Sequence, residues 1–534
     1  MRVTWAWSIW SAPSTARSTI PSGRMSGALP PGTPPGMRHA RRPGFAPPPP
    51  PRTRPRVPLM TPRISRREDM ARLTRPRRAL STNPLKSSAP LGAAMAYLGI
   101  EGAVPLFHGA QGCTAFAMVH MVRHFKEAIP LQTTAMNEVS TILGGAEQIE
   151  EAIANIRKRA HPRFIGIAST ALTETRGEDV PGELREVLAR RRDFGDLKVV
   201  YASTPDFEGA MEDGWAAAVT AIVEALVPET APQQRNTDSR QVNVLPSACV
   251  TPAEIEEIDR LIRAFGLTPI FLPDLSTALD GHLAEDWSGR SLGGTRLDDI
   301  PAMARSAATF AIGESMQGAA RLLGTRGGMP VQVFPSLTGL RAVDGFVRAL
   351  MALAGTADAP PAIRRDRARL QDAMLDAHFQ TGGLRYAIAA DPDLAYALSS
   401  ALAGMGAEAV AVVTTSGTNP IVELIPAEEA VLGDLGDLEA GARKAGASLL
   451  IAHAHGRHAA QALGLPLLRA GFPINDRLGA QDICRVGYRG TRAFLFEVAN
   501  AVLSHPHDAA RPEDFGAAPI EPEFEHDRPQ TAPH

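Results

Sequence analysis

Residues 243–273 read NVLPSACVTPAEIEEIDRLIRAFGLTPIFLP, and their pattern decides the fold class. The short apolar run NVLPS is typical of a buried strand. Thr251 then stands where a helix N-cap is expected, with Pro252 at the first helical position. Apolar residues recur at helical spacing as far as Gly266, where we expect the helix to end, and TPIFLP predicts the next strand. Strand–helix–strand units of this kind build parallel sheets with covering helices.

The same alternation recurs on both sides of this stretch. RFIGIAST and LKVVYAST precede it as predicted strands, and LRYAIAADPDLAYALSSALAGMGAEAVAVVTTS follows it as a further strand–helix–strand unit. We therefore predict an α/β protein with three Rossmann-like lobes, each a parallel sheet flanked by helices. The expected lobes span residues 70–244, 245–375 and 376–504. Ligands of such sheets bind at the carboxyl ends of the strands.

Both ends of the chain differ from this body in composition. Residues 1–69 hold twelve Arg against two acidic residues, with long proline runs and no hydrophobic period, and residues 505–534 are also loop-like. We expect both segments to be disordered tails. The first is either a true basic tail or a stretch upstream of the real start of translation. Ordered-looking sequence begins just after Met70, which favours Met70 as the start.

Charge, cysteine count and hydropathy limit the classes of function. The chain carries a net charge of −2, and residues 1–69 contribute +10, which leaves −12 for the rest. An acidic body argues against nucleic acid as a main partner. Three widely spaced cysteines make no disulfide framework, and no run of 18 apolar residues indicates a membrane span. We therefore expect a cytoplasmic protein without membrane attachment.

Common nucleotide and hydrolase motifs are missing from the sequence. It contains no GxxxxGK[ST] phosphate loop and no HExxH site, and no predicted strand is followed by a GxGxxG fingerprint. The three lobes are therefore not expected to bind nucleotides in the usual way.

FHGAQGCTAF, residues 107–116, places Cys113 where a strand is expected to become a helix. Free amides at a helix N-terminus stabilise a thiolate, which predicts a Cys113 pKa below the usual ~8.5. Gly109 and Gly112 remove side-chain bulk and permit unusual backbone angles, so a large ligand could press against the chain. These conditions suit a reactive nucleophile or an iron–sulfur ligand, and a buried structural cysteine is the alternative.

Each chemical interpretation of Cys113 is incomplete by itself. A nucleophile lacks an evident base relay, although His108 stands five residues before Cys113. Iron–sulfur clusters usually take four thiolates, whereas Cys249 and Cys484 fall in later lobes and are expected to be packing residues. If Cys113 binds a cluster, most of the remaining ligands must come from another chain.

Two groups of histidines are further candidates. His453, His455 and His458 lie in HAHGRH, where a strand is expected to give way to a helix, and turn bonding explains them more simply than metal binding does. His120 and His124 lie four residues apart on one predicted helix face. Because no third ligand is in reach by spacing, a polar or interface surface is favoured there over a metal site.

Residues 83–145, which include PLFHGAQGC and IPLQTTAMNEVS, resemble the nitrogenase component 1 superfamily, and most of all its NifN branch of cofactor-biosynthesis proteins. PDLSTALDGH, HGRHAAQALGLPLLRAGFP and VGYRGTRAFLFEVAN match as well, so the resemblance spans about residues 70–504. It also supports a start at Met70, and residues 1–69 match nothing in the family.

The resemblance implies a scaffold rather than an enzyme. It implies pairing with NifE in an α2β2-type complex, on which an iron–sulfur precursor matures into the iron–molybdenum cofactor. It also implies transient contacts with NifB and with the nitrogenase reductase (Fe protein). Each half-complex would carry one [4Fe–4S] cluster at the subunit interface, with three cysteines from NifE and one from this chain. The matching cysteine is Cys113.

The alternative is an oxidoreductase subunit that resembles the nitrogenase β chain or the light-independent protochlorophyllide reductase. The β chain contributes three first-lobe cysteines to a larger cluster, whereas the first lobe here holds only Cys113. Ser and Thr stand in PLKSSAPLGA and GIASTALTETRGED, where further cysteines would be sought. The family assigns the precursor pocket mainly to NifE, so the resemblance implies no cofactor ligand at His453 or His455.

Overall fold

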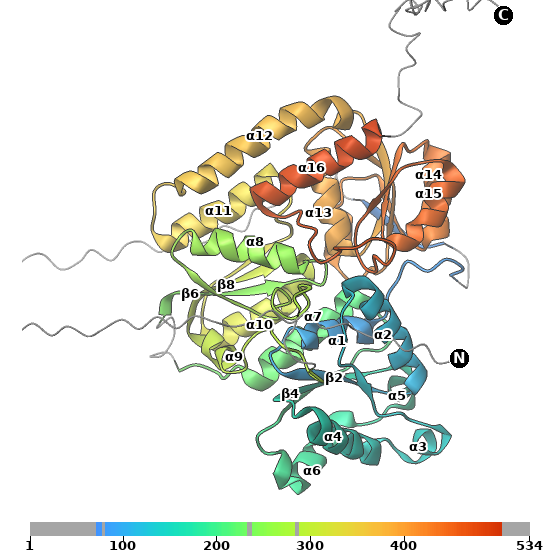
Figure 1. The fold of residues 1–534 in the computed structure, drawn as a ribbon, viewed down its shortest axis with the longest axis vertical. Coiled ribbons are helices and arrows are strands. Elements are labelled where there is room, and N and C mark those ends of the chain that lie inside the picture. Colours follow the sequence, from blue (N-terminus) through green and yellow to red (C-terminus); the bar gives the residue numbers. More distant parts are fainter. Residues whose placement is uncertain (1–70, 77–80, 232–237, 284–287, 505–534) are drawn as a thin grey trace, which may run out of the picture. The chain divides into compact units, whose positions relative to one another are not determined.

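The computed structural model describes residues 71–76, 81–231, 238–283 and 288–504. Within these ranges the chain forms three sheets, and every strand pair in them is parallel. Helices flank the sheets, as Figure 1 shows. The predicted α/β class with parallel sheets and covering helices is thus confirmed. Both predicted tails, 1–69 and 505–534, lie outside the described residues.

The first sheet has the strand order β3–β2–β4–β5. Every residue of β2 and β4 is buried, because helices cover both faces of these central strands. The strands are β2 (Ala103–His108), β3 (Gln132–Thr133), β4 (Phe164–Ser169) and β5 (Lys198–Ala202). The helices are α1 (Ala89–Leu98), α2 (Gln111–Phe125), α3 (Glu138–Leu143), α4 (Ala146–Ala160), α5 (Ala171–Arg176), α6 (Val180–Arg190), η2 (Arg192–Phe194) and α7 (Met211–Leu226).

The second sheet has the order β7–β6–β8–β9. Its first helix begins as predicted: the Thr251 side chain accepts a hydrogen bond from the Glu254 amide (3.2 Å), and Glu254 accepts one from the Thr251 amide (3.0 Å). The strands are β6 (Asp238–Pro246), β7 (Thr268–Phe271), β8 (Ser306–Ile312) and β9 (Val331–Phe334). The helices are α8 (Pro252–Arg263), α9 (Asp299–Ala302), η4 (Met303–Arg305), η5 (Glu314–Met316) and α10 (Gln317–Gly327).

The third sheet has the order β1–β12–β11–β10–β13–β14. Its edge strand β1 comes from the beginning of the described chain and pairs with β12 from Arg72↔Glu429 onward. The strands are β1 (Arg72–Thr74), β10 (Arg385–Ala390), β11 (Glu408–Thr414), β12 (Glu429–Leu432), β13 (Leu449–Ala452) and β14 (Leu467–Arg469). The helices are α13 (Pro392–Ala403), η6 (Pro420–Leu424), α14 (Leu435–Ala445), η7 (Ala454–Gly456), α15 (Arg457–Leu463) and α16 (Gly487–Leu503).

Two further helices, α11 (Leu340–Ala354) and α12 (Pro361–Thr381), connect the second and third sheets. Helix α12 packs along α16, and both are drawn side by side in Figure 1. The predicted lobe boundaries at 244/245 and 375/376 lie within β6 and α12, and the division into three domains remains a prediction. Within the described ranges, no helix combines the length and the apolar character that crossing a membrane requires.

One large hydrophobic core extends through all three sheets. It contains Tyr97 of α1, Trp215 of α7, Phe346 of α11 and Phe494 of α16, each almost completely buried. Two smaller hydrophobic cores lie between a sheet and its helices. One lies between the first sheet and helices α4 and α6, and the other between the third sheet and helices α14 and α15. The strand ends of the three sheets are therefore held in place by one continuous packed interior.

Candidate functional site

Cys113 lies at the carboxyl end of the first sheet. Strand β2 ends at His108, and α2 begins at Gln111, so Cys113 occupies the first turn of α2. Its side chain is exposed and makes no disulfide. Ala110 is the N-cap residue of α2, and its side chain caps none of the helix amides. The strand-to-helix transition predicted at this cysteine is confirmed.

The two glycines beside Cys113 act through space rather than through unusual backbone angles. Neither Gly109 nor Gly112 has a positive φ, so that part of the prediction is wrong. A Cβ at Gly109 would stand 2.1 Å from Oγ1 of Thr170, because the β2–α2 and β4–α5 loops touch there. A Cβ at Gly112 would meet no atom within 4 Å. The chain is therefore open on the Gly112 side.

The Cys113 thiol does not have the lowered pKa that its helix position predicts. Desolvation is the largest influence and, together with the Asp206 carboxylate, raises the pKa of Cys113, while the amide of Cys113 itself lowers it. Asp206 follows β5, so its approach to α2 depends on the tertiary fold and not on local sequence. In this chain alone the protonated thiol is favoured at neutral pH.

His108 is not a base for Cys113. The imidazole is fully buried at the end of β2, with Nδ1 3.1 Å from Oγ1 of Thr134 and Nε2 2.8 Å from Oε2 of Glu178. The Glu178 carboxylate also forms an ion pair with Arg176. Burial, together with the nearby guanidinium, lowers the pKa of His108 to about 4. Since both ring nitrogens are engaged inside the lobe, the nucleophile interpretation gains no support.

Neighbouring loops provide hydroxyl groups and no second thiol. Thr170 Oγ1 donates to the carbonyl of His108 (3.0 Å). The Ser169 hydroxyl donates to Glu174 and accepts from the Thr204 amide (2.7 Å). These side chains are buried and satisfied within the chain. The loop after β4 therefore supplies no sulfur ligand beside Cys113.

The other two cysteines lie in packed surroundings, as expected. Cys249 Sγ is 3.2 Å from Ser247 Oγ, and Cys484 Sγ is 3.7 Å from the Val486 carbonyl. Both pack against the main core, and desolvation raises the pKa of both thiols. In the part of the chain that the structure describes, no group of three or more His, Cys, Asp or Glu could hold a metal ion. Cys113 is therefore an exposed thiol without a second thiol beside it in the described ranges.

Apolar side chains are exposed on the segments that follow the strands of the first sheet. The carboxyl ends of parallel strands meet at one edge of a sheet, so these segments share that edge with Cys113. We call them the strand-end surface: Phe116, Val119 and Val122 of α2, Val139 and Ile142 of α3, and Phe207 after β5. Phe116, for example, is 70% exposed. Such a concentration of exposed apolar side chains is typical of a surface that binds another protein.

The two predicted histidine groups meet in the structure, although their members differ in role. His124 points into the core and accepts a hydrogen bond at Nδ1 from the Ile474 amide (2.9 Å), so it does not share a surface with His120. His453 Nδ1 accepts from the His455 amide (3.2 Å), which bears out the turn-bonding interpretation. His120 and His455 are half-buried, with ring centroids 6.1 Å apart. This contact between the His120 and His455 rings shows that α2 lies against the segment that follows β13 of the third sheet.

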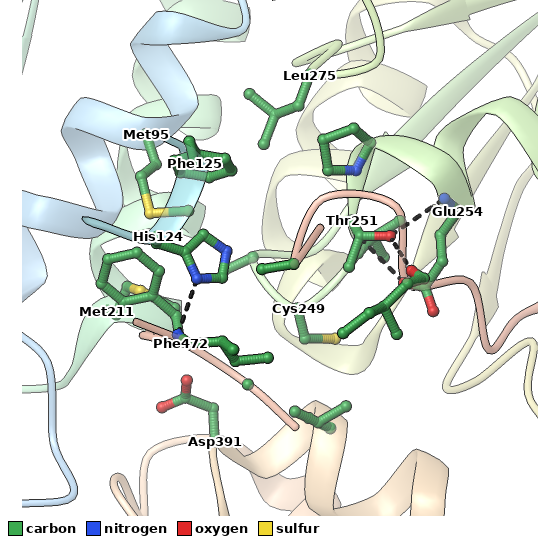
Figure 2. A pocket seen from close by; sticks show the side chains of 18 of the residues that line it. Met95, His124, Phe125, Met211, Cys249, Thr251, Glu254, Leu275, Asp391 and Phe472 are labelled. Carbon is green, nitrogen blue, oxygen red and sulfur yellow. Dashed lines mark hydrogen bonds between the residues drawn. The ribbon is translucent and has the colours of Figure 1, made fainter. Parts of the chain in front are cut away.

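A small pocket of about 60 Å³ lies where elements of all three sheets meet, shown in Figure 2. His124 comes from α2, Cys249 follows β6, and Asp391 and Phe472 follow strands of the third sheet. The volume accommodates a few water molecules. Sequence reasoning missed this pocket, because its lining comes from segments up to 390 residues apart, from Met95 to Arg485, and no local motif indicates it.

Three carboxylates lie beside this pocket: Glu212 and Asp393 are buried, and Asp391 is half-buried. Glu212 accepts hydrogen bonds from the Asp393 amide (3.0 Å) and from Nδ2 of Asn419 (2.6 Å), and the same Nδ2 donates to Asp393 (2.9 Å). Burial is the main cause of the raised pKa values of Glu212 and Asp393. Burial also raises the pKa of Asp391 to about 6, although Thr415 Oγ1 donates to it (2.5 Å). These acids link α7 of the first sheet to α13 of the third.

Asp391 should make the stability of the fold depend on pH. Its pKa is about 6 in the fold and ~3.9 in an unfolded chain. The folded state therefore binds the extra proton between these values, and its stability falls as pH rises from about 4 to 6. We expect Asp391→Asn to stabilise the chain by about 2 kcal/mol above pH 6 and by progressively less toward pH 4. Urea unfolding at pH 4.5 and 7.5 measures this, and equal effects at both values would contradict it.

A matched control is Asp358→Asn. Asp358 is exposed, and the substitution removes the same charge from the surface. It should change the free energy of unfolding by less than about 0.5 kcal/mol at either pH. A pH-dependent gain seen only with Asp391→Asn would assign the effect to the Asp391 carboxylate.

Comparison with known proteins shows to which class of protein this fold belongs. The family model described as nitrogenase component 1 type oxidoreductase matches residues 88–503. Among solved structures, "Nitrogenase Cp1 at pH 6.5" superposes with a TM-score of 0.77 at 30% identity, over 83% of this chain and 98% of that chain. The three parallel sheets and their helices are thus those of a nitrogenase component 1 protein.

Similar proteins of known name show which branch of this class the chain belongs to. The nitrogenase iron-molybdenum cofactor biosynthesis protein NifN of Rhodobacter capsulatus is 68% identical over 87% of this chain and 100% of its own length. The proteins of the same name from Nostoc sp. and Klebsiella pneumoniae are 45% and 40% identical, over 84% and 83% of this chain and 98% and 95% of their own lengths. The chain therefore belongs to the NifN family of the nitrogenase component 1 class.

Proposed function

We propose that this chain is a scaffold subunit for assembly of the nitrogenase iron–molybdenum cofactor, which pairs with NifE and is not a catalyst by itself. The names of its relatives support the role in cofactor biosynthesis. The complex would hold the cofactor precursor transiently. NifB would supply this precursor, and the nitrogenase reductase (Fe protein) would supply electrons and molybdenum–homocitrate. Within the complex, Cys113 would bind one iron of a [4Fe–4S] cluster shared with NifE.

One observation carries this proposal: Cys113 is an exposed thiol with no second thiol beside it among the described residues. A [4Fe–4S] cluster takes four thiolates, so three must be supplied across a chain boundary. When bound, the cluster would provide an electron-transfer centre at that boundary. This chain would contribute the Cys113 ligand, the open space beside Gly112 and the closely packed turn at Gly109.

The strand-end surface supports the same arrangement. Its apolar side chains, with Phe116 one turn from Cys113, would be covered by NifE. Burying them would favour association and would exclude water from a cluster at the boundary. Covering Cys113 would also replace the single chain's protonated thiol by an iron-bound thiolate, because coordination to a metal deprotonates the sulfur.

A second candidate is an oxidoreductase subunit, which the description of the matching family model favours. The absence of further cysteines in the first lobe argues against the larger cluster of a nitrogenase β chain. Reduction of acetylene or of protochlorophyllide by the purified complex at rates well above background would favour this candidate over the scaffold.

Production of the full chain with and without NifE tests the proposal. We expect the isolated chain to carry little stable iron, and the complex to carry about four iron atoms and four sulfides for each copy of this chain, with the EPR signal of a reduced four-iron cluster. A full complement of iron and sulfide in the isolated, monomeric chain would contradict a shared cluster. Failure of the two chains to co-purify would contradict the pairing.

A further inference from the structure

Basic side chains converge where α2 meets the third sheet. We call them the cationic patch: His120 and Arg123 of α2, His455 of η7, and Arg457 and His458 of α15. The imidazoles of His120 and His455 are in edge-to-face contact, which brings the two segments together. Arg123 and His458 are exposed, and the other three members are half-buried. The patch thus combines groups from segments about 330 residues apart in sequence.

In the part of the chain that the structure describes, no carboxylate pairs with the arginines of the cationic patch. Neither Arg123 nor Arg457 takes part in an ion pair among the described residues, whereas Arg469 and Arg485 in the same part of the fold pair with Asp476 and Glu497. Burial is the main cause of the lowered pKa values of His120 and His455, and the remaining causes are basic groups. Arg123 lowers the pKa of His120. His120, Arg457, Arg123 and His458 lower that of His455. Asn475 lies beside His455, and the acid next to it in sequence, Asp476, is held by Arg469 at 2.8 Å. The patch therefore has uncompensated positive potential.

The cationic patch continues the strand-end surface. Phe116 of that surface touches the His120 ring, with centroids 4.6 Å apart. His120 lies seven residues beyond Cys113 on the same helix, or about 10 Å along its axis. A protein that covers Phe116 must therefore also face His120. Asn475 lies beside His455, and its Oδ1 is buried without a hydrogen-bond partner.

We propose that the cationic patch is a docking site for a carboxylate-rich surface of the partner subunit. This rests on the proposed function, since it concerns how the NifE-type partner seats over Cys113. Carboxylates opposite the patch would supply the missing countercharge, orient the partner around Cys113 and speed association at low salt. They would also favour protonated His120 and His455, so binding should strengthen as pH falls from 8 to 6.

Charge reversal on the full chain tests this. In Arg123→Glu/Arg457→Glu, the two new carboxylates would face the carboxylates of the partner and repel them. We therefore expect the Kd for NifE to rise at least about tenfold at low ionic strength. The matched control is Lys158→Glu/Arg365→Glu, which reverses two exposed, unpaired charges elsewhere and should leave the Kd within about twofold. Wild type should bind NifE less tightly at about 0.3 M than at 0.05 M salt, and the patch variant should lose most of that difference.

Iron analysis of the same samples separates this inference from the proposed function. At protein concentrations that saturate binding, the patch variant should carry as much cluster iron as wild type, because the patch supplies no ligand. A patch variant that binds NifE as tightly as wild type at low salt would overturn the docking site alone. Wild type that fails to bind NifE would overturn both proposals. His120→Gln/His455→Gln should abolish the gain in affinity between pH 8 and 6, and an unchanged gain would exclude these histidines.

Discussion

Replacing Cys113 by alanine should remove the cluster from the complex with NifE while leaving the fold intact. Three thiolates would leave one iron open to water, so we expect cluster iron to fall at least about tenfold, with parallel loss of the EPR signal. Because the Cys113 side chain is exposed and unpaired, the free energy of unfolding should change by less than about 0.5 kcal/mol. Iron assay, EPR and urea unfolding of the same preparation measure both effects.

Cys249→Ala is the control for this result. Cys249 is partly buried against the core, and its Sγ contacts Ser247 Oγ. Its loss should cost about 1 kcal/mol of stability and leave the iron content unchanged. Opposite outcomes for the two variants, one losing iron and the other losing stability, would establish that Cys113 and Cys249 have distinct roles. Full cluster content in Cys113→Ala would refute the ligand assignment.

Local patterns predicted the elements of the fold well. Thr251 and Pro252 specify the start of α8 through contacts within one turn, so the sequence contains everything needed to place it. Strand β1 could not be found this way. It has only three residues and depends on β12, which follows more than 350 residues later. Its pairing is a tertiary event that no local periodicity indicates.

The candidate site shows the same division between local and long-range information. The position of Cys113 at a strand-to-helix transition follows from the flanking pattern and is confirmed. Its pKa was predicted wrongly, because Asp206 and desolvation outweigh the helix amides. The cationic patch was missed for a related reason: His120 and His455 were each visible in sequence, but only the packing of α2 against the third sheet brings them together.

Helices α1 and α7 cross at Gly92 and Gly214, and neither glycine should tolerate replacement by a residue with a side chain. A Cβ at Gly92 would stand 1.9 Å from the Met211 carbonyl oxygen, and one at Gly214 would stand 1.8 Å from that of Ala89. Backbone atoms cannot move aside as a flexible side chain can, so the helices would have to separate within the packed core. We expect Gly92→Ala or Gly214→Ala to destabilise the chain by about 3 to 5 kcal/mol in urea unfolding.

The same crossing positions the segment opposite Cys113, because α7 begins only four residues after Phe207. Separation of α1 and α7 should therefore move Asp206 and Phe207, and binding of NifE by Gly214→Ala should fail at temperatures where wild type still binds. Gly318→Ala is the control: Gly318 lies in α10, where a Cβ meets no atom within 4 Å. That variant should gain up to about 1 kcal/mol from the better helix propensity of alanine. If Gly214→Ala unfolds at the same urea concentration as wild type, the close crossing does not support this edge of the first sheet.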